Sequence, residues 1–403
     1  MERTLTVLTN QVSVPVLYHG SVRVVIVALM TLGLALPQSS GRPRARDLAI
    51  APGNLPTGSL NAITDVTGVR VGQTTIIEGD NVRTGVTAIL PHPGNLFQEK
   101  VPGAVFVGNA FGKLAGSTQV EDLGTIETPI VLTNTLSVGT AIDAVVGWTL
   151  AQPGNQSVRS VNALVGETND GTINDIRGRH VTREHVHAAI TAARDGAVDE
   201  GTVGAGTGTI AFGWKGGIGT SSRVVREGGA TWTVGVLVQS NYGGKLVISG
   251  VPIWKTLTPA GDRPQQVAIR GSGHRSPERQ SGDGSCMIVV ATDAPLDARD
   301  LKRLAARAIY ALARTGSTYS NGSGDFAIAF STHPSLRVTN VGTPQPRTIL
   351  PTEGVSGLFE AVLDATEEAV DNSLLKAVDV TGSGHTIRAI PIEPLKALLD
   401  VHR

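Results

Sequence analysis

Residues 284–291, GSCMIVVA, join two kinds of sequence at a single peptide bond. The residues before it, 270–284, read RGSGHRSPERQSGDG, which is polar and glycine-rich, whereas residues 287–291 form an apolar run typical of a buried strand. A loop that leads straight into a core strand can be cut without unravelling the core, because few backbone hydrogen bonds lie on the loop side. The sequence therefore predicts a chain that tolerates a break before Ser285.

The bond between Gly284 and Ser285 also permits a particular chemistry. A serine hydroxyl can attack the preceding carbonyl, and glycine allows backbone geometries that a side chain forbids. Hydrolysis of the resulting ester would free an α-amine with a pKa of about 7.7 to 8.0, able to take the proton from its own hydroxyl. None of the nine histidines lies near a serine in a nucleophile elbow. On these residues alone, a plain interdomain linker with a chance Gly-Ser pair is the favoured alternative.

A second polar turn, SNGSGD at residues 320–325, opens directly onto the apolar run 326–330. If the strands at Met287 and Phe326 pair across the helix that follows Asp297, Ser323 and Asp325 can reach the new amine. They would hold it by hydrogen bonds and stabilise its protonated form. The alternative is an ordinary hairpin-type turn.

The rest of the chain predicts a layered α/β fold. Short β-rich runs bounded by Gly, Pro or Asn cover residues 73–77, 85–90, 104–107, 129–133, 162–165 and 231–239. Several are apolar throughout, which suits strands covered on both faces. Helices are predicted from an Asp297 cap to Gly316, over residues 357–376, and after Ser137 and Thr182.

Composition excludes several classes of function. Among 403 residues, 34 basic side chains balance 34 acidic ones, so no net field favours nucleic acid or an anionic membrane as a partner. The single cysteine, Cys286, excludes an internal disulfide framework and every multi-cysteine metal site. A small substrate is therefore expected.

The first forty residues have the order of a signal peptide, with Arg23 before an apolar run at 24–36 and a small, polar segment after it. Thirteen apolar residues are too few to cross a bilayer as a helix, so no stable membrane anchor is expected. We therefore expect residues 1–40 to be a leader and the protein to be periplasmic or secreted. A mis-assigned start, which would leave the protein cytoplasmic, is the alternative.

Two further patterns carry no function. His180, Glu184, His185 and His187 form HxxxEHxH, which matches no zinc-protease motif, and His185 and His187 would face different sides of a helix. The glycines at 204, 206 and 208 lack the lysine or the ribose-binding acid of a nucleotide loop and indicate a turn.

Cys286 should point to the face of its strand opposite Ser285, as a core thiol.

The sequence resembles the L-aminopeptidase, D-amidase/D-esterase and β-peptidyl aminopeptidase family of self-cleaving hydrolases. The resemblance covers nearly everything after residue 44. It is carried by RARDLAI (44–50), NAITDVTGVRVGQ (61–73), GNAFGKLAG (108–116), TPIVLTNTLSVGTA (128–141), VGETNDG (165–171), GDGSCMIVVATDAPL (282–296) and SNGSGDFAIAFST (320–332). These strings are long and specific. The resemblance therefore favours self-cleavage over the interpretation of this segment as a plain interdomain linker.

The resemblance implies a role for each matching residue. Processing falls between Gly284 and Ser285, with Ser285 as the nucleophile and Ser323 and Asp325 as its supporting pair. Some relatives have glutamate at the last position, and the shorter aspartate has a different reach. The amide of Asn241, in VQSNYGG (238–244), is implied to bind the oxyanion, which suits a neutral N–H donor. Glu167 is implied to recognise the free amino group of the substrate, and Asp170 is a weaker candidate to assist it.

The resemblance further implies a four-layer αββα sandwich, similar to N-terminal-nucleophile hydrolases but with its own strand connectivity. Residues 41–403 would form a single hydrolase domain, cut into an α chain ending at 284 and a β chain covering 285–403, and assembled as a homotetramer. No cofactor or metal is implied. The substrate would be a small peptide, amide or ester with a free amino terminus, whose first residue is L-α, D-α or β-amino. The alternatives are an amino-acid N-acyltransferase of the same fold type and a non-catalytic binding protein.

Overall fold

Two β-sheets packed face to face form the centre of the computed structural model, which describes residues 41–227, 229–259, 284–339 and 342–402. The smaller sheet has the order β1-β2-β6-β7-β4. Its strands are β1 (Arg70–Glu78), β2 (Val82–Leu90), β6 (Ile130–Asn134), β7 (Leu164–Thr168) and β4 (Leu114–Ala115). The segment expected to be a leader lies outside the described residues.

The larger sheet has the order β10-β11-β12-β13-β3-β14, and β5 pairs with β3. Its strands are β10 (Gly217–Glu227), β11 (Ala230–Asn241), β12 (Ser285–Thr292), β13 (Gly324–Ser331), β3 (Glu99–Ala110), β14 (Val338–Thr339) and β5 (Thr125–Ile126). Two small hairpins pair β8 (Ile210–Ala211) with β9 (Trp214–Lys215), and β15 (Val380–Gly382) with β16 (His385–Ile387).

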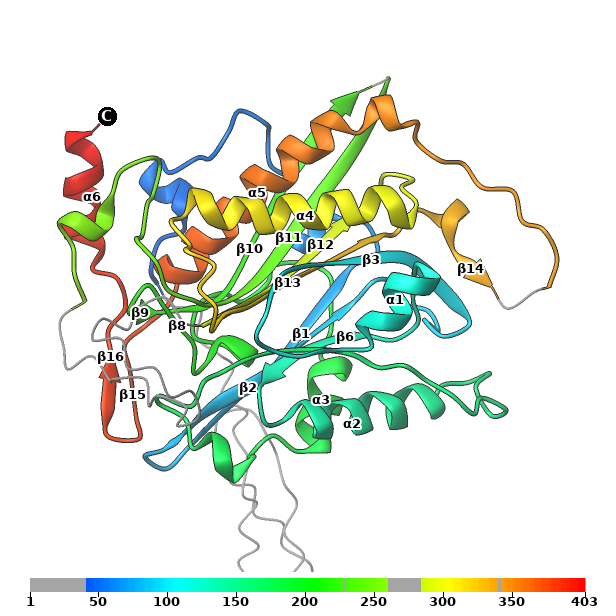
Figure 1. Ribbon diagram of the computed structural model, residues 1–403, viewed down its shortest axis with the longest axis horizontal. Helices are drawn as coiled ribbons and strands as arrows, with labels where there is room; N and C mark the ends of the chain where they lie inside the picture. Colours follow the sequence, from blue (N-terminus) through cyan, green and yellow to red (C-terminus); the bar gives the residue numbers. More distant parts are fainter. Residues whose placement is uncertain (1–40, 228, 260–283, 340–341, 403) are drawn as a thin grey trace, which may run out of the picture. The chain divides into compact units, whose positions relative to one another are not determined.

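Helices cover the outer faces of both sheets. α4 (Ala298–Arg314) and α5 (Ser356–Leu375) pack on the larger sheet, and α2 (Val138–Leu150) and α3 (Arg183–Thr191) pack on the smaller one (Figure 1). Three apolar cores fill the spaces between these layers, one of them between the sheets. The predicted αββα sandwich is thereby confirmed. The short α1 (Ser117–Leu123) and α6 (Ile392–Val401) complete the helices.

The unit β12-α4-β13 places the junction at Gly284 beside the polar turn that precedes β13. α4 begins where the Asp297 carboxylate accepts the Asp300 N–H at 3.1 Å, as the capping pattern predicts. Its apolar face packs on the sheet, so β12 and β13 run parallel with Ser285 opposite Gly324. The predicted pairing of these strands is therefore confirmed. The N-terminal ends of both strands lie side by side at the same end of the sheet.

β10 was not predicted, because its sequence GIGTSSRVVRE lacks an apolar run. Its small residues allow the strand to approach α5 closely. A Cβ placed on Gly219 would lie 1.9 Å from the Ala369 carbonyl oxygen, so only glycine lets the strand and the helix meet at this distance. Tertiary packing, rather than local preference, determines this strand.

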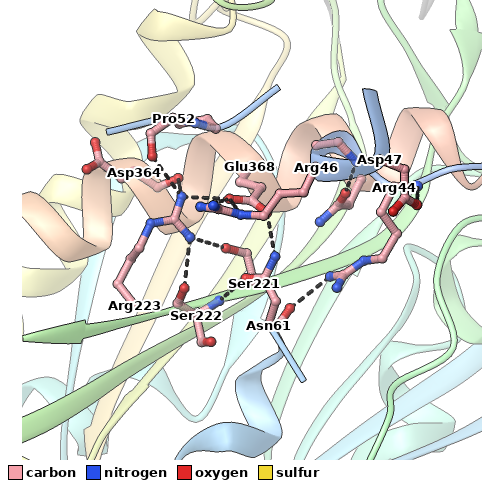
Figure 2. A network of polar contacts seen from close by, with 12 residues as sticks. Arg44, Arg46, Asp47, Pro52, Asn61, Ser221, Ser222, Arg223, Asp364 and Glu368 are labelled. Atoms are coloured by element: carbon pink, nitrogen blue, oxygen red, sulfur yellow. Dashed lines mark hydrogen bonds and ion pairs between the residues drawn. The ribbon is translucent and has the colours of Figure 1, made fainter. Parts of the chain in front are cut away.

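A buried polar network ties the start of the described chain to α5 and β10 (Figure 2). Arg223 on β10 and Glu368 on α5 are both fully buried, and their side chains form an ion pair of 2.7 Å. Arg46 reaches the same carboxylate at 3.0 Å. The Arg223 guanidinium also donates to the Pro52 carbonyl at 2.9 Å and to the Ser221 hydroxyl at 2.9 Å. Every charge at the centre of the network thus has a partner.

The described residues, from 41 onward, form one compact unit. Within the described ranges, no helix is long and apolar enough to span a bilayer.

Candidate active site

Ser285 is the first residue of β12 and lies between two other strands. Asn241, the last residue of β11, is its antiparallel partner, and Gly324, the first residue of β13, is its parallel partner. In the uncut chain the Ser285 hydroxyl donates to the Gly284 carbonyl oxygen at 2.7 Å, and the Gly324 N–H donates to the same oxygen at 3.0 Å. The carbonyl that self-cleavage would attack therefore already has a backbone donor that polarises it.

A close approach of the backbone explains the glycine at 284. A Cβ built there would lie 2.1 Å from the Asn241 carbonyl oxygen and 2.6 Å from the Tyr242 Cα. A side chain at this position would therefore push β11 and β12 apart. The predicted loop before it falls on residues outside the described ranges.

Ser323 and Asp325 form a hydrogen-bonded pair beside this junction. The Ser323 hydroxyl donates to Asp325 Oδ1 at 2.8 Å, and Ser323 precedes the glycine that contacts the Gly284 carbonyl. Asp325 is completely buried, and its Oδ2 has no hydrogen-bond partner among the described residues. Burial raises the pKa of Asp325 to about 6, although the hydrogen bond from Ser323 opposes the shift.

Strand alternation separates Asp325 from the Ser285 side chain. Met287 lies in the core between the sheets, whereas Cys286 lies in the core beneath the helices, so Ser285 faces between the sheets. Asp325 is paired with Cys286 and faces the helix layer. The hydrogen bond to Ser323 is therefore the contact that links the Asp325 carboxylate to the junction. Cys286 is completely buried, as expected of a core thiol, and burial raises its pKa well above the usual range.

The neighbours of Asn241 fix the orientation of its amide. Its Oδ1 accepts the Ile210 N–H at 2.9 Å, and its Nδ2 donates to the Asn169 carbonyl at 3.1 Å. Because one neighbour can only donate and the other can only accept, the amide cannot be flipped without losing both bonds. An N–H donor is thus held on the residue directly opposite Ser285.

Glu167 lies on β7 in the smaller sheet, with 2% of its surface exposed. Its Oε1 accepts the Lys113 N–H at 3.0 Å, and its Oε2 accepts the Thr135 hydroxyl. Burial raises the pKa of Glu167, while the bond from Thr135 and the charge of Lys113 lower it. A Cβ on Gly112 would lie 3.4 Å from Glu167 Oε1 and 3.3 Å from the Gly324 Cα. One short segment thus connects this carboxylate with the start of β13.

The predicted site residues therefore gather around the N-terminal end of β12, although they come from both sheets. Sequence reasoning missed three residues beside them, namely Thr135, Lys113 and Lys215. Lys215 is fully buried, donates to the Gly206 carbonyl at 2.8 Å and the Gly216 carbonyl at 2.9 Å, and has a pKa lowered by burial to about 7. A lysine inside the apolar and glycine-rich run FGWKGG was the available signal.

Asp170, the weaker candidate, lies next to this lysine. It is 3% exposed and accepts a hydrogen bond from the Asn174 amide at 2.9 Å. Burial, with a smaller contribution from the charge of Glu167, raises its pKa to about 6, while hydrogen bonds with Thr84 and Asn174 oppose the shift. Asp170 therefore belongs to the polar surroundings of the site.

The two patterns set aside from the sequence are structural. His180 contacts Asp175 at 3.1 Å and His187 contacts the Ala144 carbonyl at 3.0 Å, and no cluster suited to a metal occurs among the described residues. Gly204–Gly206 forms a 3-10 turn, as predicted. A surface pocket of about 310 Å³ lies near Asp297 at the N-terminus of α4, and none of the site candidates lines it.

Comparisons with known proteins identify the family to which the chain belongs. Residues 61–387 match the model of peptidase family S58. The β-peptidyl aminopeptidase BapA of Sphingosinicella microcystinivorans is 41% identical, over 94% of this chain and 96% of that protein. A β-aminopeptidase structure from Burkholderia sp. is 38% identical with a TM-score of 0.76, and the match covers 89% of this chain and 98% of that one.

A third relative connects the fold with the chemistry. The L-aminopeptidase D-Ala-esterase/amidase of Ochrobactrum anthropi, described as a prototype of serine aminopeptidases with a variant of the Ntn hydrolase fold, is 37% identical with a TM-score of 0.80. That match covers 90% of this chain and 99% of the other. An aminopeptidase is thus supported over the acyltransferase and the binding protein that the sequence left open. The chain belongs to peptidase family S58 and is an aminopeptidase.

Proposed function

We propose that this aminopeptidase cuts itself between Gly284 and Ser285 and then uses the new N-terminal Ser285 as its nucleophile. The observation that carries the proposal is the Gly284 carbonyl, which is held by the Gly324 N–H at 3.0 Å and by the Ser285 hydroxyl at 2.7 Å. The hydroxyl oxygen attacks this carbonyl carbon, the C–N bond breaks, and the amine nitrogen takes the hydroxyl proton. Water then hydrolyses the ester, which leaves a carboxylate on Gly284 and a free amine on Ser285.

In turnover the same hydroxyl attacks the carbonyl of the first residue of the substrate. The Ser285 α-amine takes the hydroxyl proton and returns it to the leaving amine or alcohol. The amide of Asn241 donates to the oxyanion, and a donor of this kind typically contributes about 3 to 4 kcal/mol. Ser323, held by Asp325, supports the α-amine. Water finally releases the acyl group and regenerates the free hydroxyl.

Glu167 supplies selectivity for a free amino terminus. A buried carboxylate pairs with the ammonium group of the substrate and offers nothing comparable to a blocked amine. Because two curated relatives are named β-peptidyl aminopeptidases, at 41% and 39% identity, we place an N-terminal β-amino residue first among the substrates, ahead of L-α and D-α residues.

Matched substrates test this function. A dipeptide with an N-terminal β-amino residue should be hydrolysed by the wild-type protein, and its N-acetyl derivative should not. Glu167→Gln should raise the KM for the free dipeptide at least tenfold and leave self-cleavage intact. Equal turnover of the free and the acetylated dipeptide would contradict the assignment of Glu167.

We also propose that residues 1–40 direct export to the periplasm or the medium and that the mature protein is a homotetramer. The signal-peptide order of the first forty residues and the family resemblance support these two proposals. The N-terminal sequence of protein from the periplasmic fraction and its mass by light scattering test them. A cytoplasmic protein that retains Met1 would contradict export.

A further inference from the structure

The carboxylate of Glu167 has a cation beside it before any substrate arrives. The Lys113 ammonium lies 3.8 Å from Glu167 Oε1. The two side chains differ sharply in exposure, since Glu167 is 2% exposed and the Lys113 side chain is 54% exposed. One partner is therefore fixed in the protein, and the other reaches it from the surface.

Glu167 retains room for an ammonium group. A carboxylate offers about four lone-pair sites. Two are used, by the Lys113 N–H at 3.0 Å and by the Thr135 hydroxyl. The Lys113 ammonium, 3.8 Å from Oε1, forms an ion pair without a short hydrogen bond and leaves the other lone-pair sites unused. An arriving ammonium group can therefore compete with Lys113 for this carboxylate.

The surroundings explain why a resident cation is needed. A buried carboxylate without a counter-charge is costly and tends to become protonated. Asp170, whose pKa the charge of Glu167 raises, is itself acidic and adds to that cost. The charge of Lys113 lowers the pKa of Glu167 and so helps to keep the carboxylate of the empty site ionised.

The lysine can leave at little cost. Its side chain is half exposed, so water can solvate the displaced ammonium. Its backbone N–H bond to Oε1 does not depend on the position of the side chain, so the carboxylate keeps its orientation after the exchange.

We propose that the Lys113 ammonium is a resident counter-ion of Glu167 that the ammonium group of the substrate displaces on binding. Lys113 is then a specificity-tuning residue, which keeps the empty site charged and competes with every substrate for the same carboxylate. The proposal rests on the proposed role of Glu167. It differs from a role of Lys113 in attracting the substrate, because a competitor weakens binding and an attractive group strengthens it.

The KM values of three variants, measured at pH 8, test the proposal. Lys113→Met should lower the KM for a free-amine dipeptide about twofold to fivefold, the range expected from loss of an exposed ion pair, and leave kcat unchanged. Lys113→Arg should keep the wild-type KM. Lys302→Met, which removes a similarly exposed lysine paired with Glu121, is the matched control and should change nothing.

The Glu167→Gln background separates this inference from the proposed function. If Glu167→Gln raises the KM, and Lys113→Met has no effect in that background, the two residues act on one ammonium site, as proposed. If Glu167→Gln raises the KM but Lys113→Met in the wild-type background leaves the KM unchanged or raises it, the counter-ion role of Lys113 is overturned. The role of Glu167 in binding the substrate ammonium group is then retained. If Glu167→Gln leaves the KM unchanged, the role of Glu167 itself fails.

Discussion

At the scale of single residues, hydrogen bonds hold most of the candidate site groups in fixed orientations. Asn241 is fixed by one donor and one acceptor, Ser323 is held by Asp325, and the Gly284 carbonyl is polarised by a backbone N–H. Preorganisation of this kind lowers a barrier because no group has to reorient as charge develops. We infer that the same arrangement serves self-cleavage first and substrate hydrolysis afterwards.

Asp325 should make stability depend on pH. Burial raises its folded-state pKa to about 6, above the ordinary value of 3.8. Its contribution to stability is therefore complete below about pH 4 and is lost as the pH rises through 6. In the uncut Ser285→Ala protein, the free energy of unfolding, relative to that of the Asp325→Asn variant, should fall by about 2 kcal/mol between pH 4 and pH 7. Urea unfolding at both pH values measures it, and a constant difference would contradict the buried, unpaired carboxylate.

What the sequence could predict at this scale depended on recognisable strings. Ser285, Ser323, Asn241 and Glu167 lie in segments that resemble the family, so they could be named without coordinates. Thr135 lies in one of these segments too, but no role was implied for it, because its contact with Glu167 arises only when β6 and β7 pair. Contacts between strands distant in sequence leave no local signal.

At the scale of elements, the unit β12-α4-β13 explains why a cut before β12 can be tolerated. Hydrogen bonds to β11 and β13 hold β12 on both sides, and Ser285 itself lies in both ladders. A break at Gly284 therefore frees one end of a strand that keeps its partners. β12, α4 and β13 were predicted because their apolar periodicities are strong, whereas β10 was missed because its small residues serve contact with α5.

Gly219→Ala should test that contact. The new Cβ would lie 1.9 Å from the Ala369 carbonyl oxygen and 2.7 Å from the Ser373 backbone nitrogen, so backbone must move on at least one side. Overpacking of a core typically costs about 1 to 3 kcal/mol, and we expect a loss at the upper end of this range. Gly139→Ala on α2 is the control, since nothing lies within 4 Å of its Cβ, and it should stabilise by about 0.5 to 1 kcal/mol. Thermal unfolding compares the two, and equal melting temperatures would contradict the packing.

At the scale of the whole molecule, the buried network of Figure 2 spans the two chains that cleavage would create. Arg223 would belong to the α chain and Glu368 to the β chain, and the two side chains are fully buried. α5 also packs on β10 and β11 across the same division. The layers could be predicted from the order of apolar strands and helices, but this network could not, because Arg46, Arg223 and Glu368 are far apart in sequence.

Glu368→Gln should therefore destabilise the protein strongly. Arg223 would remain buried without its ion-pair partner, and breaking a buried ion pair in this way typically costs about 3 to 5 kcal/mol. Asp143→Asn, which breaks an ion pair with Arg183 between half-exposed side chains, should cost at most about 1 kcal/mol. Urea unfolding of both variants in the uncut background measures the difference. Similar losses of unfolding free energy in the two variants would contradict the larger contribution of the buried network to stability.

The intact masses and N-terminal sequences of the purified wild-type and Ser285→Ala proteins test the central claim most directly. The account predicts two wild-type fragments, the smaller beginning Ser-Cys-Met-Ile and ending at Arg403, and an uncut variant without aminopeptidase activity. A wild-type protein that is active as a single uncut chain would contradict it.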